Sequence, residues 1–272
     1  TEADVAHIEG TDSESMTTGE AVRISFPNGN TRSGDYAQFE HQPRPSHADL
    51  VQRRKYGSDY DISGGGMAAG RMTVALVAAG VVAKQLLKSV NFTTVLESVG
   101  GVDDSSRFEE VIAAARDAGD SVGGVVRCTI SGASEPLGEP FFDSVESVMS
   151  HLLFSIPGVK GVAFGDGFAA AAKRGSERND MIINADGKTA TNNEGGINGG
   201  ITNGNDIVVR VAIKPTPSIA REQQTFDFAR GELSELIITG RHDSCIARRA
   251  VVVVEAMAAL ALAELKLRGG YA

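Results

Sequence analysis

The chain has 272 residues, 42% hydrophobic and 22% charged, which is enough for one large or two small cores and is not typical of a disordered chain. Its net charge of -9 excludes general nucleic-acid binding, which needs a basic surface. The two cysteines, Cys128 and Cys245, lack the spacing of a disulfide framework or a zinc site, which favours a reduced cytoplasm. The longest apolar runs, residues 74–83 and 250–263, are too short to span a bilayer, so we expect no membrane partner.

In chain order, residues 17–26 alternate as a strand does and lead into a turn at residues 28–30. Residues 70–88 predict a buried helix, with Met72, Val82 and Leu86 among its apolar positions. A short helix over residues 106–118 and a strand over residues 123–131 follow.

The second half of the chain continues this mixture. We predict an amphipathic helix over residues 141–155, a strand over residues 207–213 and a long helix over residues 246–267 that Asp243 or Ser244 could cap. Strands and helices do not alternate regularly, and no linker divides the chain. The sequence therefore predicts an α+β fold in which antiparallel sheets pack on a helical layer.

Glycine is unusually frequent, with 32 residues, and gathers in two loops. Residues 63–71 lead into the helix at 70–88, where backbone N–H groups favour anions. Residues 195–204 hold two glycine pairs that would let the backbone lie against a planar ring. A flexible turn and a long hairpin loop explain these two segments equally well.

Three further segments carry residues suited to anions or proton transfer. Residues 44–49 place Arg44 and His47 in one loop, and Arg binds phosphate or carboxylate while His titrates near neutrality. Lys214 follows a predicted strand, and Arg241 and Asp243 stand on either side of His242, a combination that could form an acid–base site. Solvated loops, and a capped helix with a salt-bridged first turn after Asp243, explain the same residues, and these alternatives stay open.

Taken together and in order, these segments resemble the chorismate synthase family. The resemblance covers nearly the whole chain, and the matching motifs are many, occur in the family's order and belong to particular loops. The matching stretches are residues 44–49, 55–57, 63–71, 78–80, 83–85, 119–124, 137–140, 175–180, 191–204, 214–219, 240–245 and 255–257.

The resemblance implies a single domain over residues 1–272 with the chorismate synthase-like β-α-β sandwich, antiparallel sheets around a helical layer. The implied reaction is the reduced-FMN-dependent anti-1,4-elimination of phosphate from 5-enolpyruvylshikimate 3-phosphate, which gives chorismate in the shikimate pathway. A cytoplasmic homotetramer is implied, together with an external flavin reductant associated with NADP.

Carried over position by position, the resemblance implies two catalytic residues. His47 matches a histidine that sits by the flavin and manages its protonation, and Asp243 matches an aspartate that helps flavin N5 accept the substrate hydrogen. Arg44, Arg71 and Arg241 match substrate contacts. The implied flavin contacts are Met67, Ala68, Ala69, Gly158, Gly199, Lys214, Pro215, Thr216, Pro217, Ser218 and Arg241.

The chain also departs from the family. The Gly-Glu-Ser-His-Gly motif and the Arg-Arg-Arg-Pro-Gly stretch that usually come first are not in these residues, so we expect part of the site to be missing from them. Met67 and Ala69 stand where polar residues are usual, and Ser244 and Val252 where prolines are usual. We expect turnover from the full-length protein and little from these 272 residues alone. The alternative is a catalytically degenerate relative that binds flavin or a shikimate-type anion without turnover.

Overall fold

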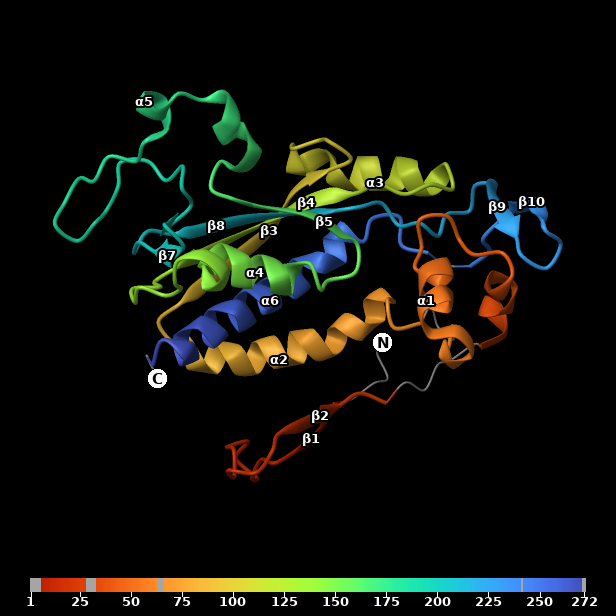
Figure 1. Ribbon diagram of the computed structural model, residues 1–272, viewed down its shortest axis with the longest axis horizontal. Helices are drawn as coiled ribbons and strands as arrows, with labels where there is room; N and C mark the ends of the chain where they lie inside the picture. The colour runs from red at the N-terminus through yellow and green to blue at the C-terminus, as the bar shows by residue number, and fades with distance from the viewer. Residues whose placement is uncertain (1–5, 28–32, 63–65, 241, 271–272) are drawn as a thin grey trace. The chain divides into compact units, whose positions relative to one another are not determined.

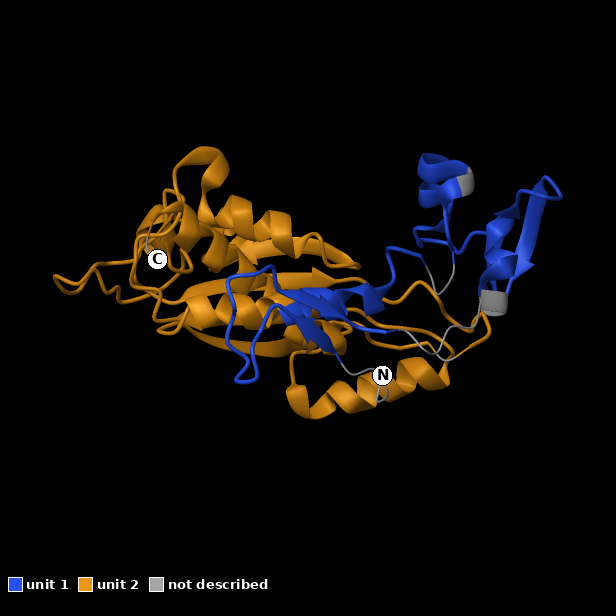
Figure 2. Cartoon of the chain, turned by 90° about the horizontal axis from the view of Figure 1, so that it is seen from below, with its two compact units in different colours: residues 1–78, 222–236 blue, residues 79–221, 237–272 orange. Residues whose placement is uncertain are grey.

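The computed structural model describes residues 6–27, 33–62, 66–240 and 242–270. The chain forms two compact units, coloured separately in Figure 2: unit 1 is Thr1–Ala78 with Glu222–Leu236, and unit 2 is Ala79–Arg221 with Ile237–Ala272. Both contain helices and antiparallel strands, which confirms the α+β class. That residues 1–272 act as a single domain stays a prediction.

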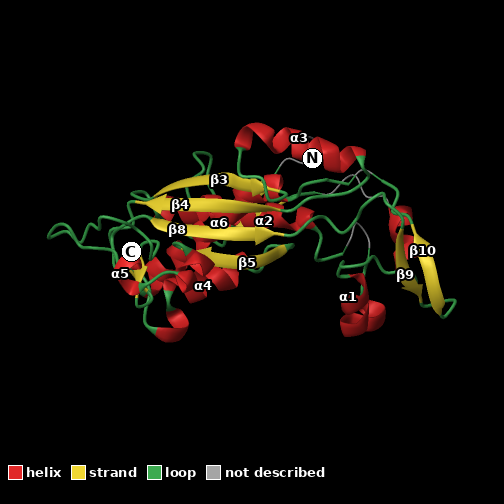
Figure 3. Ribbon diagram, turned by 90° about the horizontal axis from the view of Figure 1, so that it is seen from above, coloured by secondary structure: helices red, strands yellow, loops and turns green. Residues whose placement is uncertain are grey.

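Unit 2 is built on a four-stranded antiparallel sheet, which Figure 3 shows from above. Branched apolar residues alternate along its central strands, a pattern typical of a sheet with one covered face. In spatial order the strands are β3 (Asn91–Val99), β4 (Gly124–Ser131), β8 (Ile207–Ile213) and β5 (Val159–Phe164).

The pairing register sends apolar side chains to one face of this sheet and charged ones to the other. Cys128 of β4 lies opposite Val209 of β8, and both are fully buried. One residue away, Arg127 lies opposite Arg210 on the other face, and both arginines pair with Glu97 at 3.1 and 2.8 Å. Two adjacent arginines are tolerated there because one carboxylate bridges them.

A helical layer covers the apolar face. Figure 1 shows α6 (Ala247–Arg268) and α4 (Val145–Leu153) on the same side of the sheet; α6 contacts β3 and β4, and α4 packs on α6. The helix α3 (Phe108–Asp117) contacts β3 and buries Phe108 and Ile112. None of the helices in the described ranges has the length and apolar character needed to cross a membrane.

The helix α2 (Thr73–Leu86) begins in unit 1 and ends in unit 2. A Cβ on Gly80 would lie 2.7 Å from the Cα of Ala256, so the absence of a side chain lets α2 approach α6 closely. Lys84 pairs with Glu255 beside this contact. The predicted burial was wrong in part, since Val82 and Leu86 are 47% and 46% exposed. In α2, only the small residues Gly80 and Ala83 are buried.

Unit 1 contains two hairpins and the helix α1 (Asp49–Tyr56). The first hairpin pairs β1 (His7–Glu9) with β2 (Arg23–Ser25), a much shorter strand than residues 17–26 predict, and the predicted turn at 28–30 lies outside the described residues. The second pairs β9 (Gln223–Asp227) with β10 (Glu232–Leu236). Hydrogen bonds from Thr225 to Pro43 and from Gln42 to Ser234 hold it against the segment before α1.

The other predicted elements are confirmed to within a few residues, whereas β3 and β5 were not predicted. Short elements complete the chain. They are η1 (Ser33–Glu40), η2 (Gly57–Asp59), η4 (Gly70–Met72), η5 (Ser105–Arg107), η6 (Phe141–Asp143), η7 (Gly167–Ala172), α5 (Gly175–Arg178), β6 (Ile197–Asn198) and β7 (Ile201–Thr202).

Candidate functional site

The loop over residues 44–49 in unit 1 holds a compact charged cluster made of Arg44, His47 and Asp49. The Asp49 carboxylate accepts hydrogen bonds from Arg44 Nε and Nη2, both at 2.8 Å, and from the Arg44 backbone N–H at 3.0 Å. Nδ1 of His47 lies 2.6 Å from Oδ1 of Asp49. The side chains of Arg44 and Asp49 are only 4% and 1% exposed, so water does not compete with these contacts.

Local sequence explains why this loop closes on itself. Ser46 adopts a φ of 60°, in the left-handed region, and the His47 backbone N–H donates to the Arg44 carbonyl at 3.2 Å. Asp49 is the first residue of α1, where a negative charge also suits the helix dipole. Arg44 lies over the ring of Phe39 at 4.5 Å, which supports its guanidinium from the other side.

The Asp49 carboxyl is ionised in this setting. Burial by itself would raise its pKa, but the hydrogen bonds from Arg44 and His47 and their charges outweigh burial and hold the pKa well below its usual range. Arg44 is therefore held by Asp49, and its side chain is buried. A contact with substrate would require this side chain to face solvent, which it does not do here. The predicted substrate contact of Arg44 stays a prediction.

Replacing Arg44 by alanine should lower the free energy of unfolding of unit 1 by about 3 kcal/mol, because it leaves a buried carboxylate without its main partner. Tyrosine fluorescence during urea unfolding reports on this unit, since the chain has no tryptophan and Tyr36, Tyr56 and Tyr60 lie in unit 1. Arg54→Ala, at an exposed position of α1, is the matched control and should cost less than about 0.5 kcal/mol. Equal losses in the two variants would contradict a buried ion pair.

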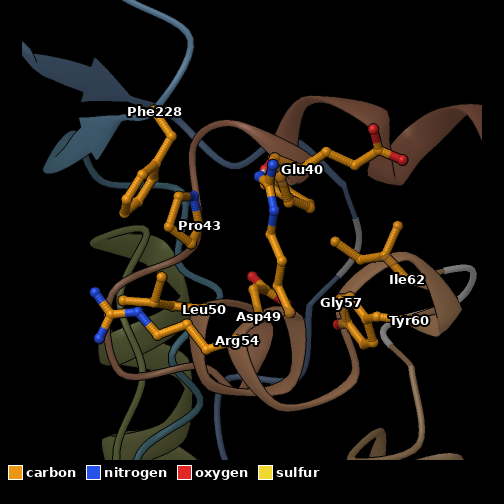
Figure 4. Close-up of a pocket in the computed structure, with 11 residues that line it drawn as sticks. Glu40, Pro43, Asp49, Leu50, Arg54, Gly57, Tyr60, Ile62 and Phe228 are labelled. Atoms are coloured by element: carbon orange, nitrogen blue, oxygen red, sulfur yellow. Dashed lines mark hydrogen bonds between the residues drawn. The ribbon is translucent and has the colours of Figure 1, made fainter. Parts of the chain in front are cut away.

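A cavity of about 500 Å³ lies beside this cluster, within unit 1. Figure 4 shows Pro43 and Phe228 on one side of it and Tyr60 and Ile62 on the other, with Asp49 between them. Its size falls in the usual range for a small-molecule site. The Tyr60 hydroxyl is buried without a hydrogen-bond partner in the described part of the chain, and burial, followed by the charge of Asp49, raises the pKa of Tyr60. Sequence reasoning did not find this cavity.

The glycine-rich segment before α2 also belongs to unit 1, although residues 63–65 lie outside the described residues. Met67 is 60% exposed, Ala68 and Ala69 are half-buried, and the Ala69 N–H donates to the Gly66 carbonyl at 3.2 Å. Arg71 follows in η4 with an exposed side chain. The segment therefore offers accessible backbone and one exposed cation.

In unit 2, several predicted flavin contacts meet at one end of the sheet. Lys214 follows β8, and its N–H donates to the carbonyl of Gly158 at 2.9 Å. The Thr216 hydroxyl donates to the backbone carbonyl of Asp243 at 2.6 Å. Ser121, which sequence reasoning missed, donates through its hydroxyl to the Thr216 carbonyl at 2.7 Å. Residues far apart in the sequence thus form one cluster.

This cluster has a positive side. Lys214 is half-buried, and burial, followed by the nearby charge of Lys160, lowers its pKa. Two neighbouring ammonium groups repel each other, and a bound anion would relieve that repulsion. The pair therefore suits a phosphate group.

The Asp243 carboxylate is held at both oxygens. Oδ1 accepts a hydrogen bond from the Cys245 N–H at 3.0 Å, and Oδ2 pairs with Nε of Arg249 at 2.5 Å. The predicted cap by Asp243 or Ser244 was wrong, because the N-cap of α6 is Ile246 and no side chain caps it. A salt bridge in the first turn of α6 was predicted, and the contacts with Cys245 and Arg249 fix the carboxylate in one orientation. The side chain of Asp243 is 27% exposed and so stays accessible.

The remaining predicted contacts divide into those near this cluster and those apart from it. Pro215, Pro217 and Ser218 continue the chain from Lys214, and Arg241 lies outside the described residues. Gly199 lies between β6 and β7, which come before the first residue of β8, whereas Lys214 follows its last residue. The seven residues of β8 span roughly 20 Å, so Gly199 and Lys214 lie toward opposite ends of this strand. Within one chain, the structure does not bring Gly199 to this cluster.

The predicted site residues are therefore divided between unit 1, with His47 and the segment at residues 67–71, and unit 2, with the cluster of Lys214 and Asp243 and, apart from it, Gly199. That these residues line a common cavity stays a prediction. The partners that sequence reasoning missed, Asp49 and Arg249, are both charged residues a few positions from a predicted catalytic residue, and that proximity is the signal that could have identified them.

Comparisons with known proteins agree on one family. The family profile described as chorismate synthase matches residues 1–267. The chain is 52% identical over 252 residues to a protein named chorismate synthase from Chitinophaga pinensis, covering 92% of this chain and 75% of that one. It is 40% identical over 298 residues to a protein named chorismate synthase from Methanosarcina mazei, covering 99% of this chain and 81% of that one.

A solved structure titled as a crystal structure of chorismate synthase is similar to the chain with a TM-score of 0.72 and 26% identity, over 98% of this chain and 79% of that one. The fold and the sequence thus point the same way. This chain belongs to the chorismate synthase family.

Proposed function

We propose that this protein is a chorismate synthase, which eliminates phosphate from 5-enolpyruvylshikimate 3-phosphate to form chorismate. The observation that carries the proposal is the family match over residues 1–267, together with 52% identity to a relative of that name. We further propose reduced FMN as the cofactor, an external flavin reductant as its electron source, and a cytoplasmic homotetramer as the working assembly, because the family resemblance implies them.

The residues of unit 2 fit a flavin phosphate in their donor chemistry. Lys214 and Lys160 form the cationic pair whose repulsion an anion would relieve. Thr216 has a hydroxyl oxygen that still accepts hydrogen bonds, and Gly158 adopts a φ of +92°, a conformation that favours glycine. Reduced flavin held there would supply the transient electron chemistry that the loss of phosphate and of the ring hydrogen needs, with no net oxidation.

The substrate carries a phosphate and two carboxylates, and this chain's net charge of -9 would repel it elsewhere. We assign its binding to arginines: Arg71, exposed in η4 just before α2, and Arg241, which matches a family substrate contact in sequence. Arginine is suited to this role because its guanidinium binds phosphate or carboxylate through two parallel hydrogen bonds.

We assign proton handling to His47 and Asp243. His47 is held at Nδ1 by Asp49, which leaves Nε2 as the ring atom at which a proton moves. The Asp243 carboxylate, held by Cys245 and Arg249, would present a fixed negative charge to a bound flavin and assist its acceptance of the substrate hydrogen.

The test is anaerobic phosphate release by the full-length protein with dithionite-reduced FMN and the enolpyruvyl substrate. We expect steady release that requires the reduced cofactor, with oxidised FMN as the control. Tight binding of FMN and substrate without release would identify the catalytically degenerate relative instead. Neither binding nor release would reject the proposal altogether.

A further inference from the structure

The shortest hydrogen-bonding contact of the predicted catalytic histidine is with the buried carboxylate of Asp49. Nδ1 of His47 lies 2.6 Å from Asp49 Oδ1 and 3.0 Å from Arg44 Nη2. These three residues come from one five-residue loop and the first turn of α1, so their geometry is set locally. The Asp49 side chain is 1% exposed, and that of His47 is 14% exposed.

Charge decides which group donates in this cluster. Arg44 contacts Asp49 through Nε and Nη2 and through its own backbone N–H, so Asp49 faces only donors on that side. An ionised carboxylate accepts hydrogen bonds and donates none, whereas a guanidinium donates and cannot accept. The 2.6 Å contact is therefore a hydrogen bond only if His47 carries its proton on Nδ1.

The same reasoning leaves the other ring nitrogen for chemistry. In the neutral ring with Nδ1 protonated, Nε2 holds the lone pair. No described residue forms a hydrogen bond with Nε2 of His47, while its Nδ1 is engaged by Asp49. Arg44 Nη2, 3.0 Å from Nδ1, can only donate, so in this tautomer it bonds to Asp49 and not to His47. A base that is held at one nitrogen and open at the other has a fixed direction for proton transfer.

We propose that Asp49 is a positioning residue that holds His47 in the Nδ1–H tautomer and in one ring orientation, with Nε2 as the atom that exchanges protons with the bound ligands. The bidentate Arg44 contact fixes the carboxylate that does this. The assignment of the tautomer does not depend on which reaction the protein catalyses, whereas the catalytic role of Asp49 rests on the proposed function.

The first test is nitrogen-15 NMR of the full-length protein at a pH where histidines are neutral. The chain has five histidines, and the signals that vanish in His47→Ala identify the ring concerned. We expect the His47 signals of a protonated Nδ1 and an unprotonated Nε2. Asp49→Asn, which offers an amide N–H toward Nδ1, should shift the population toward the Nε2–H tautomer, whereas Asp59→Asn, at an exposed position of the same unit, should not.

A His47 ring protonated at Nε2 in the unmodified protein would overturn the proposal. An Asp49→Asn spectrum identical to that of the unmodified protein would also overturn it. The unmodified spectrum decides the matter even if Asp49→Asn does not fold. This result also does not depend on turnover, so a failed activity assay and a failed positioning role are told apart.

The kinetic consequence is tested separately by a double-mutant cycle. Asp49→Asn should lower kcat at least about 10-fold with little change in KM, because the ring remains present but presents the wrong nitrogen. In a His47→Ala background the same change should cost nothing further, since the group through which Asp49 acts is gone. Losses that multiply in the double variant would show that Asp49 does not act through His47.

Discussion

Replacing His47 by alanine should lower kcat for phosphate release about 1,000-fold while FMN and substrate still bind. The physical reason is that proton transfer by a positioned side chain contributes on the order of 100- to 10,000-fold to a rate. In unit 1, His47 combines a partly accessible ring with a nitrogen anchored to the ionised Asp49. Anaerobic single-turnover assays with reduced FMN, at saturating substrate, measure this step directly.

His41→Ala is the matched control for that variant. His41 is exposed and lies six residues earlier in the same unit, and its hydrogen bonds with Gln38 and Phe228 are made by its backbone. Its replacement should leave the rate unchanged. An undiminished rate in His47→Ala would remove His47 from the mechanism and place proton transfer on another group.

Replacing Asp243 should have an effect of similar size, about 100- to 1,000-fold on kcat, because the proposed function assigns to this fixed carboxylate the assistance of hydrogen removal. Asp243→Asn is more informative than Asp243→Ala. Asparagine keeps an oxygen that accepts the Cys245 N–H bond at the start of α6, so the helix start is preserved while the charge is removed. Both variants should therefore lose rate, and the alanine variant alone should also lose stability.

The measurement that separates these effects uses substrate deuterated at the ring carbon that loses its hydrogen. If Asp243 assists that loss, its replacement should increase the isotope effect on the rate, because hydrogen removal becomes the slower step. Asp186→Asn, in an exposed loop of unit 2, is the control and should change neither rate nor isotope effect. An unchanged isotope effect in Asp243→Asn would assign its role to structure.

Local patterns predicted the elements that have strong periodicity. The strand β8 alternates strictly, with Ile207, Val209, Val211 and Ile213 buried, and was predicted to its last residue. The edge strand β3 was not predicted, because polar Thr93 and Thr94 interrupt its alternation and its register shifts between Leu96 and Ser98. The helix α2 was predicted, but its burial was not, because burial depends on the neighbours that surround it.

The sequence by itself determined the family, the α+β class and the loops in which the functional residues lie, because ordered motifs and apolar periodicity are properties of the chain. Only the tertiary structure decided what those residues contact. Arg44 was predicted to bind an anion, and the anion within its reach is the buried carboxylate of Asp49. Ser121 forms a hydrogen bond with Thr216 although the two residues are 95 positions apart in the sequence. Such pairings arise because the sheet and helices bring distant loops together. A charged side chain exchanges its partners with water until burial excludes the water, so the sequence alone does not specify its partner.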